Sequence, residues 1–148
     1  MQVAVYLSGE IHTDWRDRIV KGLEEADLPV TVLAPVTDHG ASDDVGVDIL
    51  GSEERPFWKD HKGGKINAIR TRNMIQRADV VVVRFGEQYR QWNAAFDAGY
   101  AAALGKSLVT LHDPSLTHPL KEVDAAALAV AETPEQVVEI LRYVTTKQ

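Results

Sequence analysis

The chain has 148 residues, of which 45% are hydrophobic and 26% charged, a composition typical of one compact globular domain. Sixteen Lys and Arg against twenty-two Asp and Glu give a formal net charge of −6. This balance disfavours a nucleic-acid polymer as a partner, because phosphate binding relies on summed positive charge. The absence of cysteine excludes disulfides and thiolate metal sites and fits a reducing, cytoplasmic location. We therefore expect a single cytoplasmic domain over residues 1–148.

No segment predicts a membrane span or a secretory signal. The run of valines at residues 80–83 is far too short to cross a bilayer, for which a helix needs about 20 apolar residues. Met1 and Gln2 lead directly into an apolar run, without the basic flank or small-residue cleavage site of a signal peptide. We expect no membrane partner and no signal peptide.

Short apolar runs alternate along the chain with amphipathic stretches. The runs show little polar alternation, which is typical of strands covered on both faces. They lie at residues 3–7, 30–33, 80–83, 108–111 and, more weakly, 127–130. The amphipathic stretches predict helices that begin after Thr13-Asp14, cover 66–78 and 92–104, and start again after Thr133.

This alternation predicts an α/β fold, with a parallel sheet between two layers of helices. Since crossovers between parallel strands are right-handed, we expect a flavodoxin-like, doubly wound, five-stranded sheet with strand order 2-1-3-4-5. Thr133 is expected to cap the last helix, and Gln136 to reach back and complete a capping box.

In such sheets a ligand binds beyond the carboxyl ends of the strands, at the switch point between the first and third strands. The sequence therefore directs attention to residues 8–14 and 84–92, flanked by 34–65 and 112–119. Segment 34–65 has little periodicity, although Ser42, Asp43 and Asp44 can cap a short helix that ends at Leu50. Such a long connection fits a lid and an irregular insertion equally well.

Asp97 is the only charged residue in the helix predicted over 92–104. An unpaired ionised carboxylate inside an apolar helix costs several kcal/mol, so Asp97 either faces a polar cavity, is held by specific donors, or lies on a solvated face that is rich in alanine. If Asn93 caps this helix, Asp97 lies one turn in, just past the third strand. A carboxylate in a pocket can act as a general base, a metal ligand or a nucleophile.

Other side chains near this edge have two interpretations each. Tyr6 can orient Asp97 through a hydrogen bond or be a half-buried strand aromatic. Arg84 and Arg90 can hold a 5′-phosphate or form surface salt bridges. The aromatic residues can stack on a base or lie at a rim or subunit interface; they are Phe85, Tyr89 and Trp92.

The histidines give a weaker indication, of a metal site. His12, His39 and His112 could supply ligands to a metal-dependent hydrolase if their loops converge, but the chain has no HExxH or similar spacing. Asp14 or Thr13 is better explained as a helix N-cap.

No P-loop or GxGxxG motif follows a strand, so we expect no cofactor. Gly99 lies inside a helix, where glycine costs about 1 kcal/mol, and this predicts close packing against the sheet.

Segments 9–16, 85–93, 105–106 and 118–122 together resemble the YtoQ family, a small bacterial family grouped with the nucleoside 2-deoxyribosyltransferases. The resemblance covers essentially the whole chain. The resemblance to the wider group of nucleoside 2-deoxyribosyltransferases rests on residues 6–9, 78–79 and 97–101. The last of these segments is followed by Gly105-Lys106. The resemblance implies a flavodoxin-like enzyme that cleaves the N-glycosidic bond of a 2′-deoxynucleoside through a covalent deoxyribosyl-enzyme, and a 5′-phosphate held by Arg84 and Arg90 would make the substrate a deoxynucleotide.

The resemblance places Asp97 at the position of the nucleophilic glutamate and Tyr6 at that of the supporting tyrosine. Glu10 and Glu87 are candidates for assisting the departing base. The residues expected to bind substrate are Ser8, Gly9, His12, Arg84, Phe85, Gln91, Trp92 and Asn93.

Three positions depart from the pattern of the wider group. Asp97 is one methylene shorter than glutamate, and Thr71 and Gln91 stand where acidic residues usually contact the base, so base preference does not carry over. The same substitutions support an alternative in which the protein binds or senses a nucleotide derivative without turnover. The resemblance also implies a homo-oligomer in which neighbouring subunits complete the site.

Overall fold

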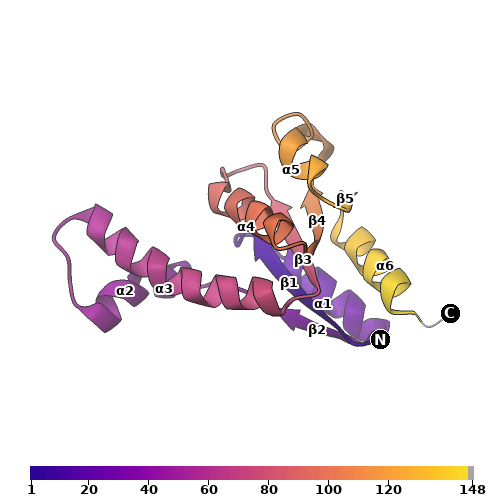
Figure 1. Ribbon diagram of the computed structural model, residues 1–148, viewed down its shortest axis with the longest axis horizontal. Helices are drawn as coiled ribbons and strands as arrows, with labels where there is room; N and C mark the ends of the chain where they lie inside the picture. Colours follow the sequence, from indigo (N-terminus) through magenta and orange to yellow (C-terminus); the bar gives the residue numbers. More distant parts are fainter. Residues whose placement is uncertain (147–148) are drawn as a thin grey trace. The chain divides into compact units, whose positions relative to one another are not determined.

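The computed structural model describes residues 1–146 and forms two compact units (Figure 1). One contains Met1–Ala34 together with the chain from Ile75 onward, and the other contains Pro35–Met74. The first unit holds the whole sheet. The single domain expected from the sequence stays a prediction. Among the helices of residues 1–146, none is both long enough and apolar enough to cross a bilayer.

The first unit is built on five parallel strands in the order β2-β1-β3-β4-β5, which confirms the predicted flavodoxin-like topology. The strands are β1 (Val3–Gly9), β2 (Val30–Leu33), β3 (Val80–Phe85), β4 (Ser107–His112) and β5 (Ala129–Ala131). β1 and β3 extend two residues beyond the apolar runs, because Ser8 pairs with Val83 and Gly9 with Arg84 in the ladder. The polar residues at these strand ends therefore belong to the sheet itself.

Helices cover both faces of this sheet. On one face, α1 (Trp15–Glu25) and α6 (Pro134–Thr145) bury Trp15, Ile19 and Leu141 against strand residues such as Leu7 and Val82. On the other face, α4 (Trp92–Ala103) packs against β1, β3 and β4. Two short elements follow β4: a 3-10 turn, η1 (Pro114–Leu116), and α5 (Lys121–Ala125). Figure 1 shows α5 beyond the end of β4.

The residues that cap the helices are partly those predicted from the sequence. The Thr133 hydroxyl accepts from the Gln136 amide at 3.2 Å, which confirms the N-cap of α6. The Gln136 side chain reaches one residue further back than a capping box requires and accepts from the Glu132 amide at 2.7 Å. The condition that Asn93 caps α4 is not met, because Gln91 occupies the N-cap position and Asn93 lies inside the helix. Asp14 occupies the N-cap of α1 without a side-chain hydrogen bond.

The second unit is a pair of helices rather than an irregular segment. α2 (His39–Leu50) is capped by Asp38, whose carboxylate accepts from the Ala41 amide at 2.8 Å, so its start precedes the predicted cap at 42–44. α3 (Pro56–Arg77) begins well before residue 66 and ends in the first unit. The two helices approach so closely that a Cβ on Gly46 would lie 2.4 Å from the Gly63 nitrogen. A lid role for this region stays a prediction.

Candidate functional site

The carboxyl ends of β1 and β3 meet at Gly9, which pairs with Arg84. Gly9 has a φ of +109°, in the region that favours glycine, and a Cβ there would lie 2.2 Å from the Arg84 carbonyl oxygen. The close approach brings Ser8 and the loop after β1 against the end of β3. Glycine is therefore a structural requirement at the point where the topology places a ligand.

Ser8 and Asp97 form the central contact of this edge. The Ser8 hydroxyl donates a hydrogen bond of 2.6 Å to Oδ2 of Asp97. Ser8 is buried and Asp97 half-buried, so this carboxylate has a specific donor and does not lie on an open, solvated face. Burial raises the pKa of Asp97 above its usual range, and the Ser8 hydrogen bond partly opposes the shift.

Tyr6 lies on the same face of β1 as Ser8, because side chains alternate along a strand. It is only 1% exposed, which makes it a fully buried aromatic rather than a half-buried one. The donor that the structure shows at Asp97 Oδ2 is Ser8, a residue expected from the sequence only as a substrate contact. Ser8 lies two residues after Tyr6, at the end of the strand, and this position is the feature of the sequence that could have identified it as the donor.

Asp97 occupies one flank of α4. Ala94, Ala98 and Ala101 are buried and face the sheet. At 100° per residue, Asp97 points to the side of β1, whereas Ala95 points to the opposite side, toward β4 and α5. We call the first side, with Ser8 and Asp97, the carboxylate flank.

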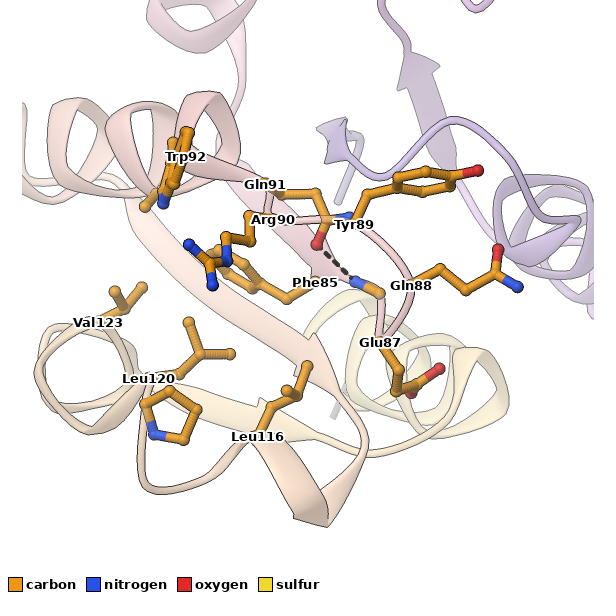
Figure 2. A pocket seen from close by; sticks show the side chains of 13 residues that line it. Phe85, Glu87, Gln88, Tyr89, Arg90, Gln91, Trp92, Leu116, Leu120 and Val123 are labelled. Atoms are coloured by element: carbon orange, nitrogen blue, oxygen red, sulfur yellow. Dashed lines mark hydrogen bonds between the residues drawn. The ribbon is translucent and has the colours of Figure 1, made fainter.

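A pocket of about 560 Å³ lies on the opposite side of α4 (Figure 2). Ala95 contributes to its wall, as do Leu116, Leu120 and Val123 from the segment after β4. Four predicted site residues line it together, namely Phe85, Glu87, Gln91 and Trp92, and so do Tyr89 and Arg90, each of which had two interpretations from the sequence. We call it the α5 pocket. Neither Asp97 nor Ser8 contributes to its lining, so α4 separates two groups of residues that the sequence placed in one crevice.

Glu10 is buried and holds the loop between β1 and α1 together. Its carboxylate accepts from the amides of His12 and Thr13, the latter at 2.9 Å, and from the Thr13 hydroxyl at 2.5 Å. Its carbonyl oxygen accepts from Trp15 Nε1 at 2.7 Å. Glu10 is therefore not a surface glutamate, and these contacts give it a structural role.

Arg16 is a buried residue that the sequence analysis did not single out. Its guanidinium donates to the carbonyl oxygens of Leu7 and Gly9 at 3.0 Å and of Glu10 at 2.6 Å. Burial lowers the pKa of Arg16 to about 10. A charged residue next to Trp15, at the start of the apolar stripe of α1, was the signal that could have identified it. Arg16 fixes the end of β1 from the face opposite α4.

Arg84 and Gln91 are held by the loop after β3. Arg84 NH1 donates to the Phe85 carbonyl oxygen at 2.7 Å, and NH2 lies 3.8 Å from Glu87 Oε1. Gln91 Oε1 accepts from the Gly86 amide at 2.9 Å, as the dashed line in Figure 2 shows. Within residues 1–146, Nε of Arg84 and Nε2 of Gln91 are buried without a hydrogen-bond partner.

The remaining predicted contacts lie at the edges of these groups. The His12 ring lies 4.6 Å from the ring of Tyr89, centroid to centroid. Glu87, Trp92 and Asn93 are exposed. The structure therefore places Ser8 next to Asp97. It gathers the aromatic residues of segment 85–92 at the α5 pocket and leaves Asn93 on the outside of α4.

His112 belongs to a buried polar cluster at the end of β4. Its Nε2 lies 2.8 Å from Oδ2 of Asp124, its Nδ1 lies 2.8 Å from the Asp113 carbonyl oxygen, and the Thr110 hydroxyl donates to Oδ1 of Asp124 at 2.8 Å. In the part of the chain that is described, no three His, Cys, Asp or Glu side chains are placed to hold a metal ion.

Comparison with known proteins agrees with this fold. Residues 6–145 match the family described as nucleoside 2-deoxyribosyltransferase YtoQ. The chain is 42% identical over 143 residues to the uncharacterized protein YtoQ of Bacillus subtilis strain 168, with 97% of each chain covered. A conserved protein from Enterococcus faecalis V583 has a similar structure, with a TM-score of 0.68 at 13% identity, over 97% of this chain and 99% of that one. A 2-deoxyribosyltransferase from Bacillus psychrosaccharolyticus gives a TM-score of 0.53 at 19% identity, over 91% and 90% of the two chains.

Proposed function

The chain belongs to the family described as nucleoside 2-deoxyribosyltransferase YtoQ, and from this premise we propose that it cleaves the N-glycosidic bond of a 2′-deoxynucleoside or deoxynucleotide, with Asp97 as the nucleophile. The observation that carries the proposal is the hydrogen bond from the buried Ser8 to the half-buried Asp97 at the switch point of the sheet. It combines a carboxylate, a donor that orients it and a position where α/β folds bind ligands.

The reaction proceeds in two displacements at the anomeric carbon. Oδ1 of Asp97 attacks this carbon, the bond to the base nitrogen breaks, and the nitrogen keeps the electron pair and takes a proton from water. The product is an ester between the deoxyribosyl group and Asp97. A second base nitrogen or a water molecule then attacks the same carbon, releases the carboxylate and loses its proton to solvent.

The environment of Asp97 suits this chemistry. The transition state has oxocarbenium character, and a nearby carboxylate stabilises the positive charge before it forms the ester. Partial burial removes water from around the carboxylate and strengthens that interaction. Attack by Oδ1 keeps the Ser8 bond to Oδ2 throughout, so the side chain does not need to rotate. Tyr6, on the same face of β1, supports the position of the carboxylate in our proposal.

The proposal assigns no acid role to Glu10, because its carboxylate accepts from the loop residues His12 and Thr13. Glu87 lines the α5 pocket, on the other side of α4 from Asp97. The departing base is therefore protonated by solvent, which suits bases whose ring nitrogens accept a proton readily.

The test is incubation with a panel of 2′-deoxynucleosides and 5′-deoxynucleotides, with and without a second free base, followed by chromatography. We expect release or exchange of the base with the native chain and neither with Asp97→Asn. Asp97→Glu tests the reach of the shorter side chain, since a displacement of about 1 Å at a reacting atom costs about 100-fold in rate. Binding of these compounds without turnover by either form would contradict the proposal and support the binding protein instead.

A further inference from the structure

The α5 pocket is a cavity that the reaction proposed for Asp97 does not use. Its volume of about 560 Å³ lies within the range of roughly 300–1,000 Å³ that is typical of small-molecule sites. Leu116, Leu120 and Val123 form one side of it, which we call the apolar wall, and Phe85 adds further apolar surface (Figure 2). A cavity with such sides binds the apolar part of a ligand.

The apolar wall is held in place by polar contacts behind it. Asp124 on α5 accepts from the Thr110 hydroxyl at 2.8 Å and lies 2.8 Å from Nε2 of the buried His112. The Asp113 carboxylate caps the short turn η1. Because these contacts fix α5 and η1 without any ligand, the pocket is formed in advance, and binding costs little conformational entropy in the protein.

Arg90 gives the pocket a positive charge that the described part of the chain does not neutralise. Its guanidinium makes no hydrogen bond and no ion pair with any of residues 1–146, and its Cζ lies 5.9 Å from the centroid of a Trp92 ring. Figure 2 shows the guanidinium directed between Trp92 and Leu120. A guanidinium presents a planar fork of N–H donors, which matches the two oxygens of a carboxylate.

The other charges near the pocket also favour an anion. Among the lining residues that the structure describes, Glu87 is the acidic one, and its Oε1 lies 3.8 Å from NH2 of Arg84, which offsets its charge. Figure 2 shows the Glu87 carboxyl group directed away from Arg90. The N-cap residue of α4, Gln91, makes no side-chain capping bond, so the partial positive charge of the first turn adds to that of Arg90.

We propose that the α5 pocket binds an aromatic carboxylate, with the carboxylate group on Arg90 and a body of one or two rings against the apolar wall. Trp92 is 72% exposed and offers a flat face on which a ring can stack beside the guanidinium. The apolar wall has no side chain that could hydrogen-bond the polar edge of a nucleobase, which disfavours a nucleotide here. This is a second site, separated by α4 from Asp97, and it does not depend on the reaction proposed there.

Calorimetric titration of the native chain with 2-naphthylacetate tests the proposal. We expect a Kd of roughly 0.1–1 mM, an affinity that ligands of this size reach. The neutral 2-naphthylacetamide should bind about tenfold more weakly, because it lacks the charge that pairs with Arg90. Octanoate, which keeps the charge without a ring, should also bind about tenfold more weakly. No binding of 2-naphthylacetate, equal binding of the amide or of octanoate, or tighter binding of the cationic 2-naphthylethylamine would overturn the proposal.

Arg90→Gln tests the anchor for the carboxylate. It should weaken binding of 2-naphthylacetate about tenfold and leave binding of the amide unchanged. The native residue is exposed, so the variant should fold, and circular dichroism checks this. The matched control is Arg77→Gln, an exposed arginine that precedes β3 and lies at the other end of that strand from the pocket. Loss of affinity in the control, or none in Arg90→Gln, would contradict the assignment.

A bulky substitution on α4 tests the position of the ring body. Ala95→Trp fills part of the pocket and should weaken binding of both the acid and the amide. Gly99→Trp adds the same side chain one turn further along α4, outside the pocket lining, and should bind both as the native chain does. A Cβ on Gly99 would have no heavy atom within 4 Å, so the sequence-based expectation that Gly99 packs against the sheet was wrong. Native affinity in Ala95→Trp would overturn the placement.

Asp97→Asn separates this site from the proposed reaction. The Kd of 2-naphthylacetate should be the same in this variant, and a 5′-deoxynucleotide should not displace the probe from the native chain, because α4 lies between the two groups of residues. Tighter binding in Asp97→Asn would show that the probe lies beside that carboxylate and would overturn the proposal. Both titrations are read without turnover, so they give an answer whether or not the chain cleaves a nucleoside.

Discussion

The Ser8 hydroxyl on β1 donates a 2.6 Å hydrogen bond to Oδ2 of Asp97 on α4, and this bond joins two elements far apart in the sequence. The donor is buried and the acceptor half-buried, so the contact is shielded from water on one side. Its cause is local: the tight pairing of Gly9 with Arg84 fixes the end of β1, and the buried alanines of α4 fix the helix on the sheet. Asp97 thus has a defined position at the edge where ligands bind in such folds.

Replacing Asp97 with asparagine should separate activity from stability. Activity should fall by about 10⁴-fold or more, because the nucleophile is lost. Because burial raises the pKa of Asp97 above 3.8 in the folded chain, ionisation opposes folding, and native stability falls as the pH rises from 3.8 through the raised pKa. Asp97→Asn should therefore be the more stable protein at neutral pH, with the advantage vanishing below pH 3.8. Urea unfolding across this range measures it, and a less stable variant at pH 7 would contradict it.

Ser8→Ala should shift the pH dependence of the reaction. The Ser8 hydrogen bond lowers the pKa of Asp97, so its loss raises that pKa further. The acidic limb of the kcat/KM profile should move to higher pH, and the rate at neutral pH should fall about 10-fold, the value of a hydrogen bond to a charged group. Ser8→Thr keeps the hydroxyl and should restore the limb. An unchanged limb in Ser8→Ala would show that the bond does not act on the reacting carboxylate.

The sheet and the partly buried setting of Asp97 could be predicted from the sequence, and the start of α3 could not. Valine and leucine runs identify a buried strand directly, and a single charge in an alanine-rich helix singles out Asp97. The start of α3 was missed because Gly63 and Gly64 interrupt its periodicity, while packing of Gly63 against α2 at Gly46 stabilises the helix.

The organisation of the site was harder to predict for a geometric reason. Sequence spacing places Ala95 and Asp97 two residues apart, but the helix directs them to opposite sides. Phe85 at the end of β3 and Trp92 at the start of α4 were therefore grouped with Asp97, although they line the α5 pocket. Along β1 the sequence pointed to Tyr6 as the residue that orients Asp97 and to Ser8 only as a substrate contact, and the structure shows Ser8 donating to Asp97.

The polar cluster at the end of β4 should contribute strongly to stability. Asp124 contacts both the Thr110 hydroxyl and Nε2 of His112, so Asp124→Ala leaves these two buried polar atoms without that partner. We expect the free energy of unfolding to fall by about 3 kcal/mol. Glu122→Ala, an exposed site on the same helix, should change it by less than about 0.5 kcal/mol. Urea unfolding of the two variants gives the comparison, and equal effects would show that the cluster does not anchor α5.

Gly9→Ala should destabilise the chain by about 3 kcal/mol or more. Alanine at a φ of +109° is strained, and its Cβ would overlap the Arg84 carbonyl oxygen. The control is Gly64→Ala in α3, where a Cβ meets open space and the helix should gain about 1 kcal/mol. Thermal unfolding of both variants measures the difference. A Gly9→Ala chain as stable as the native one would mean that the contact between the ends of β1 and β3 is less closely packed than the structure indicates.

Trapping the intermediate tests the role of Asp97 most directly. A deoxynucleoside that carries fluorine on the sugar slows the second displacement more than it slows ester formation, so mass spectrometry of the treated protein reports the ester itself. We predict the added mass of one fluorinated sugar on the peptide that contains Asp97, and none on the Asp97→Asn protein. Base release with no added mass at Asp97, or with the sugar attached to another side chain, would contradict the account.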